Sequence, residues 1–584
     1  MSAAPAGRWG AQALGEGSYR FGLWAPAATR VDLVLDDAVH PLQSLGSGWF
    51  QGEAACAIGC PYRFRIDGTD EVPDPASRWQ PHGVEGASAV LDTQGHRWTQ
   101  DAWHGRPWQE LVIYEVHLGS SGGCAGLQAQ LPALAAMGIT AIELMPVAQF
   151  PGRRNWGYDG VFPFAPAEAY GTPDALKRLV DEAHRHGIAV LLDVVYNHFG
   201  PQGNHLHRYA PDFFAADTHT PWGAAIDFTQ PAVQQFFIDN ALMWLHEYRF
   251  DGLRLDAVHA IAPQAFLQQL ADAVRASVPA QRHVHLVLEN EHNQAHWLRG
   301  TFDAQWNDDF HNALHVLLTA EREGYYAAYA GPGRAAQLLA RCLAEGFAWQ
   351  GEATPDGRAR GEPSADVPPD RFVVFAQNHD QIGNRAFGER LITLVGPERY
   401  RAALALTLLT PMVPLVFMGE PWGAQQPFQF FTDFEAPLDE AVREGRRGEF
   451  AAFAAFADPQ ARDRIPDPNA KATLERSRVA LPGPGDEAAA DAMAWFKRVL
   501  GLRRLHLQPG LAQARPLGAT VLGEQAVQAG WQLPGGQWWV ALNAGDTPVP
   551  HTLPEGGTVL ELGTSGNRGQ VAAEGGFLAR WIPA

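Results

Sequence analysis

The chain has 584 residues, of which 46% are apolar and 18% are charged, and its formal net charge is −20. This length exceeds what one core usually holds, so we expect one large domain with smaller domains attached, and the composition excludes global disorder. The negative charge argues against a nucleic-acid partner and an anionic substrate, and a neutral ligand such as a sugar fits it better.

Residues 1–98 are predicted to form a small β-sandwich domain. Short apolar runs at residues 21–26 and 30–35 are separated by turn residues, and residues 62–68 alternate between apolar and polar side chains before an Asp-Gly turn. Alternation with a period of two is typical of strands that bury one face. The sequence therefore predicts a sheet-rich first domain.

From residue 99 to residue 508 short apolar runs alternate with helical patterns. Some runs are apolar throughout, as expected for parallel strands that are buried on both faces. Eight strand–helix units predict an α/β fold of the TIM (β/α)8 barrel type, with a doubly wound open sheet as the alternative. The predicted strands are residues 111–119, 141–147, 188–195, 252–258, 285–291, 302–306, 372–378 and 413–419.

The end of the chain returns to a β pattern. The last barrel helix is expected at residues 489–507, and residues 509–584 are expected to form a C-terminal β domain around an apolar strand at 537–542. A segment rich in Pro and Gly, residues 354–369, is predicted to be an exposed loop between the sixth and seventh strands.

Polar residues gather where four predicted barrel strands end. They are Asp193, Asn197 and His198 after strand three, Arg254 and Asp256 on strand four, Glu289 on strand five, and His379 and Asp380 after strand seven. The reacting groups of a TIM barrel lie at the carboxyl ends of its strands. We therefore expect three carboxylates, Asp256, Glu289 and Asp380, to converge there.

The spacing of these residues indicates opposite roles for two of the carboxylates. Arg254 and Asp256 are two positions apart on a strand, so both face one side, and the guanidinium favours the ionised carboxylate that a nucleophile requires. Glu289 would have to stay protonated to donate a proton to a leaving oxygen. Such a pair is what glycoside cleavage needs. A purely structural role is the alternative for each residue alone, above all for Asp193, which is expected to hold Arg254.

In this order, the four segments resemble the four signature regions of the α-amylase family, glycoside hydrolase family 13. The resemblance implies that Asp256 is the nucleophile of a retaining mechanism and that Glu289 is the general acid and then the base. It also implies that Asp380 is the third carboxylate, which holds sugar hydroxyls. The positions that resemble the family's substrate-binding residues are His117, Tyr158, Asn197, His198, Arg254 and His379.

One branch of that family resembles nearly the whole chain. The similarity is carried by residues 305–315, 321–326, 377–385 and the loop at 442–450. That branch hydrolyses the α-1,4-glucosidic bond next to the terminal trehalose of maltooligosyltrehalose, and it acts after a synthase that forms the trehalose end. The resemblance implies the same substrate and partner here, no cofactor, and an N-terminal domain similar to a carbohydrate-binding module.

Two segments depart from the expected pattern. Residues 119–124 lack the loop expected after strand one, and residues 290–294 match only in part. Neither segment contains one of the three carboxylates, so these differences bear on substrate specificity more than on catalysis. A debranching or branching enzyme of the same family is therefore one alternative. A non-catalytic carbohydrate-binding barrel is another, although such a protein would usually have lost one of the three carboxylates.

The remaining signals concern metal ions and location. The four cysteines lack the spacing of a zinc site, and His205 and His207 are interpreted as solvated residues, so no metal is expected. Residues 1–21 contain no apolar run of the secretion-signal type, and no run approaches the roughly 18 residues of a membrane span. We expect a cytoplasmic protein with free or structural thiols.

Overall fold

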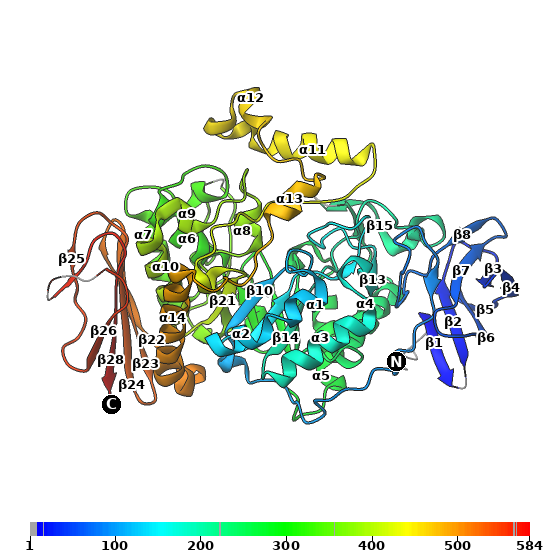
Figure 1. The fold of residues 1–584 in the computed structure, drawn as a ribbon, viewed down its shortest axis with the longest axis horizontal. Coiled ribbons are helices and arrows are strands. Elements are labelled where there is room, and N and C mark those ends of the chain that lie inside the picture. The colour runs from blue at the N-terminus through cyan, green and yellow to red at the C-terminus, as the bar shows by residue number, and fades with distance from the viewer. Residues whose placement is uncertain (1–8, 16, 221–222, 356, 565–566, 568) are drawn as a thin grey trace.

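The computed structural model describes residues 9–15, 17–220, 223–355, 357–564, 567 and 569–584. A barrel occupies the centre of the molecule, with one sheet-rich region at each end (Figure 1). The first eight residues of the predicted N-terminal domain, and of the segment inspected for a secretion signal, lie outside the described residues.

The N-terminal region consists of two sheets that pack face to face. The predicted strands at 21–26, 30–35 and 62–68 are present, and their inward side chains Phe21, Leu33 and Phe64 are fully buried. One sheet has the order β1 (Gly10–Gly15), β2 (Ser18–Trp24), β6 (Trp49–Ala55), β5 (Gln43–Gly46). The other has the order β4 (Ala38–Pro41), β3 (Val31–Leu35), β7 (Pro61–Ile66), β8 (Asp70–Val72), and β9 (Ser88–Ala89) pairs with β7.

The central region is a closed barrel of eight parallel strands, which confirms the predicted TIM barrel and excludes the open sheet. All eight predicted strands take part, although each is shorter than expected. They are β10 (Ile113–Val116), β11 (Ala141–Leu144), β14 (Ala189–Val194), β17 (Gly252–Leu255), β18 (His285–Leu288), β19 (Ala304–Trp306), β20 (Phe372–Val374) and β21 (Val413–Phe417).

The interior of the barrel has an apolar base and a polar upper layer. Side chains such as Ile113, Ala141 and Leu191 pack together in the base. Two positions further along the same strands, on the same face, stand the buried acids Glu115, Glu143 and Asp193. The alternation of strands thus brings charged groups to the carboxyl end of the barrel.

The helices form the outer layer, and local signals fix their starts. Helix α3 begins at Pro173, and the Thr172 side chain accepts a hydrogen bond from the Ala175 N–H at 3.2 Å. The others are α1 (Gly123–Gln128), α2 (Leu131–Met137), α4 (Pro231–His246), α5 (Ala265–Ser277), α6 (Asp308–Thr319), α7 (Arg334–Glu345), α9 (Leu391–Val395), α10 (Pro397–Leu409) and α14 (Glu487–Leu502); α3 ends at Arg185.

Helix α14 is the predicted last barrel helix, but its end differs from the prediction. The chain continues from 503 to 507 as a turn of π-helix, in which Arg503 is buried. Its guanidinium donates to the carbonyl oxygens of Leu408, Thr410 and Met412 at 2.6–2.9 Å. This arginine satisfies carbonyl groups at the end of α10 and just beyond it, and it joins the end of α14 to that of α10.

The C-terminal region is a sheet that packs on the barrel through α7 and α10. Trp538 is fully buried in this interface, and its indole N–H donates to the Leu409 carbonyl at 2.8 Å. The sheet order is β22 (Arg515–Gly523), β23 (Ala526–Leu533), β24 (Gly536–Asn543), β28 (Gly576–Pro583), β26 (Thr558–Glu561), and the pair β25 (Val549–Pro550) and β27 (Gln570–Val571) lies beside it.

Between β21 and α14 the chain makes an excursion above the barrel, drawn in yellow in Figure 1. It contains α11 (Leu438–Glu449), α12 (Pro459–Arg462) and α13 (Lys471–Arg476). Residues 442–450 were expected to be a loop, and that expectation was wrong: all but the last belong to α11. Ion pairs of the (i, i+3) type, Arg446 with Glu449 and Arg447 with Glu444, support the helix.

No helix in the described ranges combines the length and apolar character that a membrane crossing needs. The four cysteines, all of them described, are free thiols.

Candidate active site

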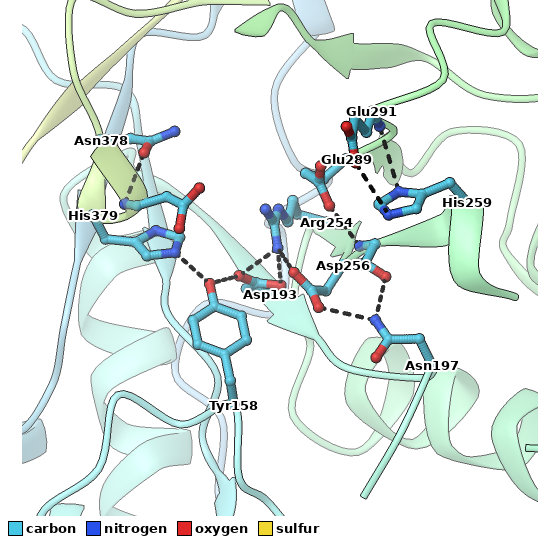
Figure 2. A network of polar contacts seen from close by, with 12 residues as sticks. Tyr158, Asp193, Asn197, Arg254, Asp256, His259, Glu289, Glu291, Asn378 and His379 are labelled. Carbon is cyan, nitrogen blue, oxygen red and sulfur yellow. Dashed lines mark hydrogen bonds and ion pairs between the residues drawn. The ribbon is translucent and has the colours of Figure 1, made fainter. Parts of the chain in front are cut away.

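The four polar segments meet at the carboxyl ends of the barrel strands (Figure 2). Asp193 belongs to β14, Arg254 to β17, and Asp256 and Glu289 directly follow β17 and β18. His379 begins the short helix α8 (His379–Gly383), which follows β20. Residues up to 187 positions apart in the sequence, from Asp193 to Asp380, are thereby collected in one place.

Arg254 is the centre of the charge network. Its Nη1 lies 2.9 Å from both oxygens of Asp193 and 2.7 Å from Oδ1 of Asp256. The guanidinium is buried and lies over the Trp306 ring, 4.1 Å from the centroid. One buried cation is thus shared by two carboxylates, and this arrangement holds both of them in place.

Asp256 is held in place by a cation and an amide. Its Oδ1 accepts from Arg254, and its Oδ2 accepts from Nδ2 of Asn197 at 2.9 Å. The Asn197 amide also donates to the Asp256 carbonyl at 3.0 Å. The side chain remains 15% exposed, so an oxygen of this fixed carboxylate can still reach a substrate.

Glu289 is kept protonated by its surroundings. Burial raises its pKa well above the ordinary value; Arg254 opposes this change, while the negative charge of Asp256 adds to it. The Ala257 N–H donates to Oε2 of Glu289 at 2.6 Å. Ala257 has a φ of 43°, an uncommon conformation for alanine, and this conformation accompanies the turn that aims the N–H at Glu289.

His379 and Tyr158 form the opposite wall of the network. The Tyr158 hydroxyl donates to Oδ2 of Asp193 at 2.6 Å and accepts from Nε2 of His379 at 2.9 Å. Glu115 accepts from the His379 backbone N–H at 2.9 Å and from its Nδ1. Burial alone would lower the pKa of His379, but the charge and hydrogen bond of Glu115 outweigh this effect and raise it, which favours the cationic imidazole.

Asp380 stands on the outer side of this group. Asn378 caps α8 by accepting from the Asp380 N–H at 2.9 Å, and Nδ2 of Asn384 donates to Oδ1 of Asp380 at 2.6 Å. Asp380 is exposed, yet the protein around it limits its hydration. That loss of solvation and the negative charge of Asp256 raise its pKa, while His379 and Arg254 oppose the change.

Two of the predicted substrate-binding histidines are occupied by protein groups. Nε2 of His198 contacts the Tyr158 carbonyl at 3.0 Å, which holds the backbone of the tyrosine. His117 is almost fully buried: its Nδ1 accepts from the Ser120 N–H at 3.0 Å, and its Nε2 lies 2.8 Å from the Asn155 carbonyl. The structure therefore places His117 beside the hydrogen-bonded network and does not include it there.

Three acidic residues near the site were not among the sequence candidates. Glu115 holds His379, as described above, and Glu143 is its partner on the next strand. Asp308 follows β19; burial and then the nearby Asp380 raise its pKa to about 7. A signal for each was present, because Glu115 and Glu143 are charged residues inside apolar strands and Asp308 follows a strand end.

Comparison with known proteins gives a consistent result. Residues 90–222 match the family described as alpha amylase, catalytic domain. A malto-oligosyltrehalose trehalohydrolase of Deinococcus radiodurans is 39% identical over 86% of this chain and 83% of its own length. Another, from Rhizobium sp., is 38% identical over 94% of both chains. The crystal structure of a putative alpha amylase from Salmonella typhimurium is similar with a TM-score of 0.92 and 41% identity, over 98% of this chain and 99% of that one.

Proposed function

The chain belongs to the malto-oligosyltrehalose trehalohydrolases, glycoside hydrolases of the α-amylase family, and on this premise we propose that Asp256, Glu289 and Asp380 carry out its reaction. That reaction is the hydrolysis of the α-1,4-glucosidic bond next to the terminal trehalose of maltooligosyltrehalose, which releases trehalose. The observation that carries the proposal is the contrast between Asp256, whose carboxylate is fixed by Arg254 and Asn197, and Glu289, whose pKa is raised by burial.

In the first step Asp256 attacks the anomeric carbon of the glucose that precedes the trehalose unit. Glu289 donates its proton to the glycosidic oxygen, the carbon–oxygen bond breaks, and trehalose leaves. The maltooligosaccharide remains as an ester on Asp256. The two hydrogen bonds on the Asp256 carboxylate support this role because they orient it before attack.

In the second step Glu289, now ionised, takes a proton from water, and the water oxygen attacks the same anomeric carbon. The ester bond to Asp256 breaks, and the configuration of the sugar is retained. Asp380, Arg254 and the cationic His379 are proposed to hold the hydroxyls of the reacting glucose. Tyr158 is proposed to stack against it, with Asn197, His198 and His117 supporting these groups.

Two alternatives are less well supported. A branching or debranching enzyme would share the carboxylates, but relatives that match most of the chain are trehalohydrolases. A non-catalytic binding barrel would not need a fixed, partly exposed carboxylate beside a second one whose pKa is raised by burial. We also propose that the protein acts in the cytoplasm, after a synthase that forms maltooligosyltrehalose.

The experiment is to incubate the protein with maltotriosyltrehalose and, separately, with maltopentaose, and to identify the sugars released. Rapid release of trehalose from the first, with little attack on the second, would support the proposal. Equal cleavage of both, or cleavage only of a branched glucan, would indicate another branch of the family. No product from any substrate would favour the binding barrel.

A further inference from the structure

Helix α11 rests on the barrel through an arginine and not through an apolar face. Among its twelve residues, all of them described, Arg446 is the buried one, at 7% exposure. Surface helices normally bury an apolar stripe against the core. A helix whose one buried side chain is charged is held by hydrogen bonds, so what Arg446 contacts determines where α11 lies.

Arg446 contacts the turn that follows Asp380. Its Nη2 donates to the carbonyl oxygens of Gly383 at 2.7 Å and of Arg385 at 3.0 Å. These two carbonyls belong to the residues on either side of Asn384. The Nη1 group also reaches Oδ1 of Asn384, at 3.5 Å. The guanidinium therefore holds the backbone on both sides of Asn384 and touches its side chain.

Aromatic rings and an acid fix the guanidinium itself. It lies 5.6 Å from the centroid of the Phe430 ring and 4.9 Å from that of Phe450, both within cation–π range. Glu449, one turn further along α11, accepts from Nη1 at 3.0 Å. Since the planar group is fixed on several sides, it can impose a position on the turn that it contacts.

Asn384 connects Arg446 with the active site. Its Nδ2 donates to Oδ1 of Asp380 at 2.6 Å, while its Oδ1 is directed to Arg446. Because an amide has its donor and acceptor on opposite arms, fixing the oxygen side also fixes which way the N–H₂ points. The chain of contacts runs from α11 through Arg446 and Asn384 to Asp380.

We propose that Arg446 is a positioning residue for the reaction: it holds Asn384 so that the Asp380 carboxylate faces the substrate, and it thereby makes helix α11 part of the active-site framework. This inference rests on the proposed role of Asp380. It assigns a function to helix α11 of the excursion, which lies above the barrel in Figure 1.

The excursion is seated at a second point, next to another loop of the barrel top. The Ala454 N–H approaches Oε1 of Glu323 at 3.4 Å. A Cβ atom on Gly324 would lie 2.9 Å from the Phe453 ring, so this glycine allows close approach. The Arg154–Asp433 ion pair and the Trp156 hydrogen bond to the Gln429 carbonyl also hold the excursion, so loss of Arg446 would remove specifically the contact that reaches the turn after Asp380.

The test compares trehalose release from maltotriosyltrehalose by wild type, Arg446→Ala, Arg446→Lys, Asn384→Ala and the double variant Asn384→Ala/Arg446→Ala. The matched control is Arg447→Ala, which breaks surface ion pairs on the same helix with Glu444 and Asp463. We expect kcat to fall about tenfold in Arg446→Ala and in Asn384→Ala, the effect of losing one hydrogen bond to a charged group. Arg446→Lys should recover part of this loss, since an ammonium can bond one of the carbonyls but not both.

The double variant decides whether Arg446 acts through Asn384. If it does, the kcat of the double variant is no lower than that of the less active single variant. Losses that multiply would overturn the proposal, as would a change in KM alone or an equal loss in Arg447→Ala. If Arg446→Ala fails to fold, Asn384→Ala alone remains decisive: with an unchanged Tm it must lower kcat, and unchanged kcat would overturn the inference.

Asp380→Asn separates this inference from the proposed function. Low activity in Asp380→Asn together with normal activity in Arg446→Ala and Asn384→Ala would overturn the role of Arg446 while leaving that of Asp380 intact. Normal activity in Asp380→Asn would instead overturn the proposed role of Asp380, and the role of Arg446 with it.

Discussion

The two sides of the site differ in how their side chains are held. The inner side consists of Arg254, Asp193, Asp256, Tyr158 and His379. The outer side consists of Asp380, Asn384 and Arg446. Each inner side chain has at least two partners of opposite charge or complementary hydrogen bonding. On the outer side, among the described residues, Asn384 gives the Asp380 carboxylate its one side-chain hydrogen bond.

The difference follows from where the residues stand in the fold. At the centre of the inner side, Asp193 and Arg254 lie on neighbouring barrel strands and Asp256 directly follows one, so the strand pairing fixes their positions. The outer groups come from a short helix and from an excursion that is seated by an arginine. The inner side is therefore preorganised for charge stabilisation, whereas the outer side depends on a few contacts that single substitutions can remove.

The largest effect is expected at the centre of the inner side, in Asp256→Asn. The amide keeps the shape of the side chain and can still accept from Asn197, but it cannot form the ester. We expect kcat for trehalose release to fall by about 10⁴-fold. Thermal unfolding of the variant serves as the control for folding. Retention of more than a tenth of the activity would contradict the role of Asp256 as nucleophile.

Glu289→Gln should have the second-largest effect, a loss of kcat of about 10³-fold, because the amide cannot donate the proton. The wild-type pH profile is linked to the same residue. Since the pKa of Glu289 is raised, the acid stays protonated well above its ordinary range, and kcat/KM should fall only as the pH rises through that higher value. Profiles of both proteins from pH 4 to pH 10 check this. An alkaline limb that persists unchanged in Glu289→Gln would assign it to another group.

Glu115→Gln tests whether the inner side depends on residues that never reach the substrate. Without the carboxylate, the buried His379 loses the partner that keeps it cationic. We expect kcat/KM to fall by about 10²-fold, and the free energy of unfolding to drop by about 3 kcal/mol, because a buried charge is left unpaired. Denaturant titration and steady-state kinetics measure the two effects. A normal Tm with normal kinetics would show that Glu115 is dispensable.

The sequence predicted the barrel correctly because apolar runs are local patterns, and patterns of the same kind led to the choice of the three carboxylates as candidates. Apolar runs identify buried strands, and polar residues at strand ends identify the catalytic face. It did not predict partners that are distant in the chain: Glu115 and His379 are 264 positions apart, and nothing in either segment points to the other. Helix α11 was missed for a related reason, since it has no apolar stripe and its one buried side chain is Arg446.

The surroundings of His117 are another feature that the sequence did not indicate. Its place at the end of strand one predicted a contact with the sugar. In the structure the ring is surrounded by Tyr170, Phe428 and Phe431, and both nitrogens face protein groups. The direction of a side chain at a strand end depends on the loops that cover it, and those loops come from distant parts of the sequence.

Substitution of Glu143 is expected to have the smallest effect on activity. Unlike Glu115 on the neighbouring strand, Glu143 does not hold another of the described side chains of the site. Neither of its oxygens has a hydrogen-bond partner among the described residues. Burial, followed by the charges of Glu115 and Asp193, raises its pKa well above the ordinary value of 4.5. The folded protein therefore keeps a proton on Glu143 that the unfolded chain releases above that value. Stability is favoured at low pH and declines as the pH rises toward the folded-state pKa.

Glu143→Gln should remove this pH dependence, because the amide does not titrate and is as neutral as the protonated acid. We expect kcat to change less than about twofold, since Glu143 has no hydrogen-bond partner among the described residues and no proposed contact with the substrate. The Tm of the variant should match that of wild type near pH 4.5 and exceed it increasingly toward pH 8. A variant that is less stable than wild type at pH 8 would mean that Glu143 is ionised and paired, and the inner side would then hold one more negative charge than the network around Arg254 can balance.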